Sequence, residues 1–388
     1  MGAVGAWRVE RADLAVEQTR TVELKVLAVT LALVALGVAM VFSASIPLAA
    51  GRETGDIFHY LKRELAFVAV GLAAMWVASR LAMDRVREGA WPLLVATVIA
   101  LAGLFVFGTR VNGARSWYSV FGLSFQPSEM AKIVLVIAAA RCFVRFPGGL
   151  PDWRSAARPF VMLAVVAGLI ALQPDVGTAA VIVVSMFVYF HIAGAKLRHL
   201  VAAGGVTAIP ALVMFRLHPY QWKRIIDFIS GGPEVALAGG YQKERALIAL
   251  GSGGLTGCGY CGSVEKYFYL PAATTDSILA VVGEELGLLF TWAVVALFCL
   301  LVWWGMMIAR KAPDRFCALV AAGVTCSLGL QALLNIAVVT GSVPATGVPL
   351  PFVSYGGSSL LFSLIGVGLL LNVSRTIHRK LAWRGLNE

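Results

Sequence analysis

Residues 26–45 read VLAVTLALVALGVAMVFSAS, an uninterrupted run without a charged side chain. A helix needs about 20 mostly apolar residues to cross the hydrocarbon core of a bilayer, so this run predicts a transmembrane helix. Comparable runs recur along the chain and predict about ten spans. They lie near residues 25–45, 61–79, 91–107, 127–144, 159–173, 177–193, 198–215, 278–304, 316–340 and 359–374.

The composition of the chain agrees with this interpretation. Hydrophobic residues make up 59% of the 388 residues and charged residues only 14%, and the mean hydropathy is +0.82. Soluble domains carry about 25% charged residues, so the soluble class is excluded. The sequence therefore predicts an all-α polytopic integral membrane protein.

The distribution of charge predicts the orientation. If the N-terminus is placed in the cytoplasm, the cytoplasmic segments hold 20 of the 32 basic residues and 9 of the 21 acidic residues. The net charge of +11 then lies wholly on that side, as the positive-inside rule requires. We therefore expect both termini in the cytoplasm, and we attribute the basic excess to topology and anionic lipid, with no nucleic acid among the partners.

Three segments follow from this topology. Residues 1–24 are predicted to be a loose or surface-lying cytoplasmic tail, residues 25–374 the membrane domain, and residues 375–388 a second cytoplasmic tail. The first apolar run follows a charged tail and is long enough to span, so no cleavable signal peptide is expected. The only sizeable polar loop, residues 216–275, is predicted to be external, between the seventh and eighth spans.

Two cysteines of this external loop, Cys258 and Cys261, form a single CxxC motif. A zinc site would need a second pair of ligands, and none is close in sequence. The pattern therefore favours a strained disulfide or two free thiols over a metal site.

Ionisable groups at membrane depth are the most informative residues of such a chain, because each costs roughly 2.5–3.5 kcal/mol at the centre of a helix. Glu129 and Lys132 are spaced i,i+3 behind Pro127, so they lie on one helix face and can pair. A helix start with a self-neutralising pair explains Glu129 well. It explains a lysine one turn into an apolar helix less well, which leaves a functional role open.

Further acids follow at the same predicted side of the membrane. Asp175 and Asp276 each precede a span and suit a helix N-cap. Glu284 and Glu285 come eight and nine residues after Asp276, about 12–13 Å along an otherwise apolar helix. Several acids along one helix predict an aqueous or ligand-filled cleft.

The stretch from residue 341 to residue 359 is rich in proline and glycine and has no charge. Non-helical backbone near membrane depth is tolerated where it is buried or lines a cavity. Gln331 and Asn335, spaced i,i+4 on the preceding helix, can satisfy such backbone or bond to a neighbouring helix. Together with a loop that mixes basic and aromatic residues around Arg224, these groups predict an external polar cleft for a ligand with a lipid tail and an anionic head.

At these residues the chain resembles the shape, elongation, division and sporulation (SEDS) family, which comprises RodA, FtsW and SpoVE, and it is most similar to the FtsW and SpoVE branch. The resemblance runs from about Val38 to Arg375. Its motifs are Val41–Ser45, Tyr60–Arg63, Asn112–Arg115 with Trp117, Gln126–Glu129 with Lys132, Pro174–Asp175 with Gly177–Thr178, Gly240–Gln242, Gly283–Gly287, Ser354–Ser359 and Leu370–Arg375.

The resemblance implies a peptidoglycan glycosyltransferase that polymerises lipid II by inverting transfer in the bacterial cytoplasmic membrane, with its active site facing the exterior. Asp276 matches the acidic residue that is essential in the family and would act as general base. Lys132, Arg115, Arg224 or a divalent cation such as Mg²⁺ would stabilise the pyrophosphate leaving group, the cation being implied by the family alone. The remaining candidates for the substrate cavity are Glu129, Asp175, Glu284, Ser354, Tyr355 and Gly356.

The family also implies partners, namely a class B penicillin-binding protein that cross-links the new strand and other division proteins. The sequence departs from the family motif at Ala272, where glutamate is usual, at Thr274, where histidine is frequent, and at Ser277, where phenylalanine is common. Two alternatives therefore stand beside the polymerase: a non-catalytic scaffold of the division complex, and a lipid II flippase.

Overall fold

The computed structural model describes residues 3–51, 56–111, 114–120, 123–205, 207 and 239–387. Within these ranges the protein is nearly all helical, as the sequence predicts. The helices are α1 (Ala3–Ala50), α2 (His59–Ala78), α3 (Met83–Phe107), α4 (Pro127–Phe143), α5 (Trp153–Leu172), α6 (Val176–Ala193), α9 (Gly239–Ser252), α10 (Ile278–Lys311), α11 (Arg315–Val339) and α12 (Gly357–Asn387).

In this described part of the chain, seven helices are long and apolar enough to cross a membrane: α1, α3, α5, α6, α10, α11 and α12. Helix α2 carries Lys62, Arg63 and Glu64 in its first two turns, and α4 has only 17 residues. The predicted span 198–215 is helical over residues 197–205 and otherwise lies largely outside the described residues. A count of ten spans stays a prediction.

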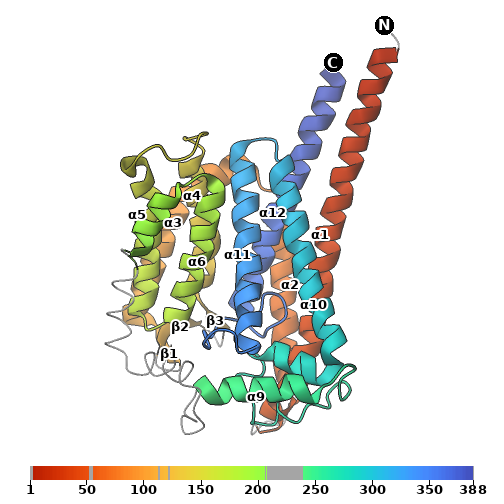
Figure 1. Cartoon of the computed structure of the whole chain (residues 1–388), viewed down its shortest axis with the longest axis vertical. Coiled ribbons are helices and arrows are strands. Elements are labelled where there is room, and N and C mark those ends of the chain that lie inside the picture. Colours follow the sequence, from red (N-terminus) through yellow and green to blue (C-terminus); the bar gives the residue numbers. More distant parts are fainter. Residues whose placement is uncertain are drawn as a thin grey trace.

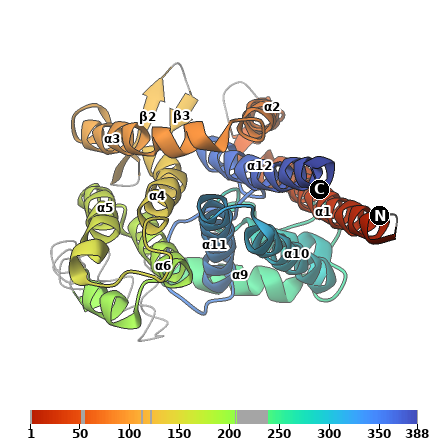
Figure 2. The ribbon, with the colours of Figure 1, turned by 90° about the horizontal axis from the view of Figure 1, so that it is seen from above.

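The long helices run side by side, and both ends of the chain lie at the same end of the molecule (Figure 1). Seen from above, α4 and α11 lie between the other helices, whereas α3, α5 and α10 are peripheral (Figure 2). Burial agrees with this arrangement: 72% of the most apolar window of α11 is buried, compared with 28% for α3. Helix α4 is buried almost all round, because it has no polar stripe beyond its first turn.

A small antiparallel sheet lies at the end of the molecule opposite the termini (Figure 1). Its strands are β1 (Thr109–Val111), β2 (Ala114–Val120) and β3 (Leu123–Phe125), in the order β1-β2-β3. The hydroxyl of Tyr118 donates to the carbonyl of Ala100 at 2.8 Å, which fixes the sheet on α3. The prediction of an all-α chain missed these strands, because β1 and β3 are too short to show an alternating pattern.

Residues 3–24, which we expected to be a loose or surface-lying tail, continue α1 as a helix. Near the end of this segment Glu23 accepts from Arg375 of α12 at 2.8 Å. On the same helix α12, Asn372 donates to the carbonyls of Ala78 and Leu81 at 2.7 and 2.6 Å. These contacts join the two ends of the membrane domain and the end of α2.

Candidate active site

Asp276 lies directly before α10, at the end of the molecule where α9 lies. The N-cap of α10 is Ser277, which makes no side-chain capping bond, so Asp276 is not the cap that its position suggested. Instead Ser277 accepts from Gln242 of α9 at 3.0 Å. The carboxylate of Asp276 is half-buried and points toward Gly347, where an added Cβ would lie 3.8 Å from its Oδ2.

The backbone that carries Asp276 is held at three consecutive carbonyls, those of residues 274–276. The first accepts from the amide of Tyr355 at 2.9 Å, the second from the hydroxyl of Ser354 at 2.6 Å, and the third from the side-chain amide of Asn335 at 2.9 Å. Carbonyls outside a helix need such donors where the protein withdraws them from water. The aspartate is thereby placed by α11 and by the stretch before α12.

Glu129 and Lys132 form the ion pair that their spacing predicts. Their carboxylate and ammonium are 2.7 Å apart, and both side chains are almost wholly buried in the first turns of α4. Pro127 occupies the first helical turn, where its missing N–H costs nothing. A buried charge of either sign is tolerated here because the partner compensates it.

The side chain of Gln331 connects this ion pair to the loop before α12. Its Oε1 accepts from the ammonium of Lys132, and its Nε2 donates to the carbonyl of Pro349 at 2.9 Å. One turn later Asn335 donates to the carbonyl of Val348 at 2.9 Å, in addition to that of Asp276. The predicted use of Gln331 and Asn335, satisfying irregular backbone, is therefore confirmed.

Asp175 caps α6 and lies beside the ion pair. Its carboxylate accepts from the amide of Thr178 at 3.2 Å and from the side chain of Gln126 at 3.3 Å. Burial raises the pKa of Asp175 above its ordinary value, against the hydrogen bonding with Thr178, and the charge of Glu129 raises it further. The N-cap that the sequence predicts is confirmed, and the acid is brought within electrostatic reach of Glu129.

The first turn of α6 packs directly on the loop before α12. A Cβ at Gly177 would overlap the carbonyl oxygen of Thr346, so only glycine fits this contact. Tyr355 contacts Tyr60 edge-on, with ring centroids 5.5 Å apart. Gly356 precedes α12, and its carbonyl accepts from Leu360 at 2.9 Å.

Arg115 has a structural contact of its own. Its guanidinium donates to the carbonyl of Phe105 at 2.7 Å near the end of α3, and its amide donates to the carbonyl of Gln173 at 3.3 Å. A cation beside the C-terminus of a helix is favourable, because the last carbonyls carry partial negative charge. Arg224 lies outside the described residues.

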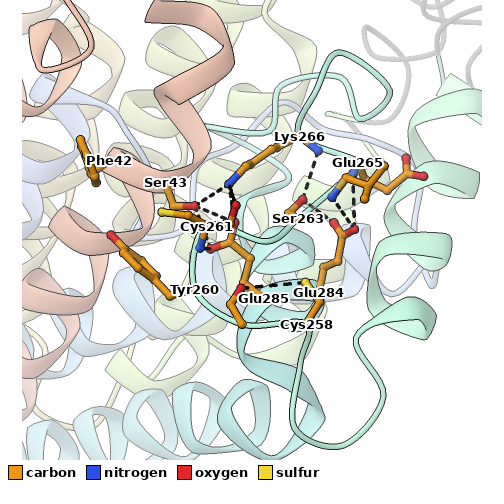
Figure 3. A network of polar contacts seen from close by, with 12 residues as sticks. Phe42, Ser43, Cys258, Tyr260, Cys261, Ser263, Glu265, Lys266, Glu284 and Glu285 are labelled. Atoms are coloured by element: carbon orange, nitrogen blue, oxygen red, sulfur yellow. Dashed lines mark hydrogen bonds and ion pairs between the residues drawn. The ribbon is translucent and has the colours of Figure 1, made fainter.

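Glu284 does not point into a ligand-filled cleft with Asp276, as its place in the sequence suggested. Its carboxylate accepts from the hydroxyl of Ser263 and from the amides of Val264 and Glu265 at 2.9 and 3.4 Å (Figure 3). With three donors from one loop, this buried acid is satisfied within the protein. Its geometry indicates that it anchors the loop.

Glu285 is satisfied by Lys266, an ion pair that the sequence did not predict. The two charged groups are 2.8 Å apart and fully buried. The ammonium of Lys266 also donates to the hydroxyl of Ser43 at 3.0 Å and to the carbonyl of Cys261 at 2.8 Å, so all its protons have acceptors. In Figure 3 these groups converge from α1, α10 and the loop between α9 and α10. Cys258 and Cys261 are both free thiols.

The backbone of α10 is broken just after these two acids. Gly287 has φ 82° and ψ 177°, a conformation that only glycine adopts readily. The carbonyls of Glu284 and Glu285 accept from the amides of residues 258 and 259 at 2.9 and 3.0 Å, and the amides of residues 288 and 289 donate to the carbonyls of residues 254 and 255. The loop therefore supplies partners for these four backbone groups beside the break, as a broken helix in a membrane requires.

The described residues contain no group of three His, Cys, Asp or Glu side chains placed to hold a metal ion. The carboxylate of Glu129 is already paired with Lys132, and that of Asp175 with helix amides and Gln126. These residues do not make a protein cage for a divalent cation.

Chemically, the site offers a fixed carboxylate and a buried ammonium. Asp276 can accept a proton, and Lys132 has two protein acceptors in the described part of the chain for its three N–H groups. Buried polar atoms without a partner among the described residues lie close by, on Ser128, Asn335 and Thr346. Sequence reasoning gave Gln242 no role beyond a family motif, and it missed the pairing of Lys266 because Glu285 lies 19 residues further along the chain.

Comparison with known proteins identifies the family. The family model described as cell cycle protein, for FtsW, RodA and SpoVE, matches residues 23–379. Stage V sporulation protein E of Bacillus subtilis is 37% identical over 91% of this chain and 97% of that protein. The probable peptidoglycan glycosyltransferase FtsW of Alkalilimnicola ehrlichii is 40% identical over 88% of this chain and 86% of that protein.

Solved structures agree with the sequences. A chain from a peptidoglycan synthase complex, described as coordinating polymerization and crosslinking, superposes with a TM-score of 0.73 at 29% identity, covering 90% of this chain and 96% of that one. The rod shape determining protein RodA of Thermus thermophilus gives a TM-score of 0.66 at 28% identity, over 90% of this chain and 95% of that one. The chain therefore belongs to the family of FtsW, RodA and SpoVE.

Proposed function

We propose that this protein is a peptidoglycan glycosyltransferase that polymerises lipid II in the bacterial cytoplasmic membrane, during division or sporulation. The observation that carries the proposal is the placement of Asp276, whose backbone segment is held at three carbonyls. Helix α11 links this segment, through Asn335 and Gln331, to the buried pair of Glu129 and Lys132. Relatives named FtsW and SpoVE over nearly the whole chain support the same activity.

Asp276 acts as general base in this proposal. It takes the proton of the acceptor sugar hydroxyl while that oxygen forms a bond to the anomeric carbon of the donor. The bond from that carbon to the undecaprenyl pyrophosphate breaks, and the leaving group departs with the electron pair. Attack opposite the leaving group inverts the anomeric configuration.

Lys132 stabilises the charge that develops on the pyrophosphate. Two of its N–H groups bind Glu129 and Gln331, and the third is the donor for a phosphate oxygen. Glu129 compensates the charge of the ammonium and orients it in a buried place. A divalent cation is an expectation from the family alone, and no step is assigned to it, because the described acids form no cage for one.

We place Asp276 at the external face. The opposite end of the molecule holds both termini (Figure 1). The sequence concentrates basic residues in the segments on the side of the termini, which the positive-inside rule assigns to the cytoplasm. Lipid II would then enter from the outer leaflet. A transpeptidase of the class B penicillin-binding type, together with other division proteins, is the partner that we propose, supported by the likeness to a synthase complex that couples polymerization to crosslinking.

The test is polymerisation of lipid II by the purified full-length protein, alone and with its cognate transpeptidase. We expect Asp276→Asn to abolish the product in both cases, and Asp56→Asn to leave it unchanged, since Asp56 is paired with the exposed Lys62 at the same face. Normal product from Asp276→Asn would refute the mechanism. Complementation of a deletion by that inactive variant would favour the scaffold, and movement of lipid II across vesicles by it would favour the flippase.

A further inference from the structure

A second polar site lies at the end of the molecule opposite Asp276, in the angle between α3, α4 and α5. It is a cavity of about 340 Å³. Ligand sites of proteins start at about this volume. The residues that line it are Trp91, Arg141, Cys142, Arg145, Phe146, Pro151, Asp152, Arg154, Ser155 and Arg158.

The cavity is strongly basic, with four arginines against a single acid. Asp152 is used by the protein, since it caps α5 by accepting from the amide of Ser155 at 2.8 Å. None of the four arginines takes part in an ion pair within the described ranges. All four arginines line the same cavity, so their charges face one space.

One of these arginines is held in place by a backbone carbonyl of α3 that a proline leaves without its helical donor. Pro92 lies inside α3 and has no N–H, so the carbonyl of Glu88 lacks its helical donor. Arg141 supplies the missing bond at 3.0 Å and also donates to the carbonyl of Arg87 at 2.8 Å. This side chain is therefore oriented before any ligand binds, which lowers the entropic cost of binding.

The helix faces that continue from the cavity toward the middle of the molecule are apolar and exposed. On α3, Val95 follows Trp91 by four residues and is 55% exposed; on α5, Val161 and Val165 follow Arg158 by three and seven residues and are 57% and 44% exposed. Residues with these spacings lie on one helix face. A ligand that fills the site thus meets positive charge at one end and apolar side chains at the other.

We propose that this arginine cavity binds the phosphate headgroup of an anionic phospholipid of the adjacent leaflet, with the acyl chains lying along α3 and α5. Basic pockets between helices at the cytoplasmic surface are suited to such headgroups, and a tryptophan at the rim suits the membrane interface. A free phosphate would use the arginines but would leave the apolar faces uncovered. The site plays no part in the transfer reaction proposed for Asp276.

The experiment measures phospholipid binding to the purified full-length protein by native mass spectrometry. The probes are phosphatidylglycerol and phosphatidylcholine, which share acyl chains and differ in headgroup charge. We expect phosphatidylglycerol to bind preferentially. Replacing Arg145 and Arg158 by glutamine in one variant should weaken it roughly 25-fold, since each surface cation contributes about a fivefold preference for anionic lipid.

The matched control replaces Arg310 and Lys311 by glutamine. Both residues are exposed in the last turn of α10 and lie outside the cavity. The affinity of this control for phosphatidylglycerol should stay within about twofold of that of the unmodified protein, because binding in the cavity depends on local contacts and not on the total charge. Equal weakening in both variants, unchanged binding in the arginine variant, or equal affinity for the two lipids would overturn the proposal. So would displacement of bound phosphatidylglycerol by millimolar inorganic phosphate, which would assign the site to a free anion. A second variant, Arg154→Gln, removes a single exposed charge of the cavity. Measured in the same way, it should weaken the binding of phosphatidylglycerol by the factor of about five that one surface cation contributes.

Discussion

The side-chain amide of Asn335 in α11 donates to the backbone carbonyl of Asp276 at 2.9 Å, although Asp276 lies before α10 and the two residues are 59 positions apart. The same amide group donates to the carbonyl of Val348, so one side chain ties α11 to the segment before α10 and to the loop before α12. The position of the proposed base therefore depends on a residue that cannot itself transfer a proton.

We predict that Asn335→Ala lowers both the stability of the protein and the rate of lipid II polymerisation. Two buried carbonyls lose their donor, which costs about 1–3 kcal/mol each, and Asp276 loses its orientation. Thermal unfolding in detergent and a polymerisation assay measure the two effects.

The control for this substitution is Asn372→Ala, which removes an equivalent pair of bonds to Ala78 and Leu81 at the opposite end of the molecule. It should destabilise the protein to a similar extent and leave the turnover of the folded fraction unchanged. Equal turnover in both variants would show that Asn335 has no positioning role.

Lys132→Met and Lys266→Met should both destabilise the protein by about 3–5 kcal/mol, because each leaves a buried carboxylate unpaired. Only Lys132→Met should reduce the turnover of the folded protein, because the ammonium of Lys266 is fully used by Ser43, Cys261 and Glu285.

The double variant Glu129→Gln, Lys132→Met tests whether Lys132 acts on the leaving group. It removes both charges, so it should recover part of the stability that Lys132→Met loses while staying inactive. Recovery of activity together with stability would mean that Lys132 acts on the fold and not on the leaving group.

Gly287→Ala should sharply lower the yield of folded protein. The backbone at Gly287 has φ 82° and ψ 177°, which strains any residue with a Cβ. An added Cβ would also overlap the amide nitrogen of Gly257 and the carbonyl oxygen of Leu255.

Gly168→Ala is the matched control, since no atom lies within 4 Å of its Cβ position inside α5. That change should be neutral or stabilise by up to about 1 kcal/mol, and size-exclusion profiles of the two variants give the comparison.

Asp175 makes the stability of the protein depend on pH, in the direction that its pKa shift defines. Its pKa is raised in the folded protein, so folding favours the protonated form. The stability contributed by this group is present below its ordinary pKa of 3.8 and is lost as the pH rises through the raised value. Asp175→Asn stays neutral and keeps an oxygen for the cap of α6, so the midpoint of thermal unfolding should fall less in this variant than in the unmodified protein as the pH is raised above 3.8. An unchanged slope would contradict this assignment.

Local sequence patterns predicted much of the helical fold and part of the site. The i,i+3 spacing of Glu129 and Lys132 and the i,i+4 spacing of Gln331 and Asn335 were enough to predict their pairing and their contact with irregular backbone. Both are relations within one helical turn or with the nearest loop. The cap of α6 by Asp175 is equally local.

The features that the sequence did not predict depend on residues distant along the chain. Glu284 was placed in a cleft because the acids recur along a single helix, but loop residues 263–265 satisfy it. The burial of Lys266 against Glu285 needs α1 as a third partner, through Ser43. A glycine in an apolar run gives no sign that its φ is positive, so the break of α10 was missed as well.

The break at Gly287 separates the short helical segment that follows Asp276 from the remainder of α10, which extends across the predicted membrane region. The carbonyls of residues 284 and 285 and the amides of residues 288 and 289 all bond to residues 254–259, so the two parts of α10 are joined through this loop and not through a continuous helix. The segment that carries Asp276 is therefore braced from outside α10, by the loop that follows α9, by Asn335 of α11 and by Ser354.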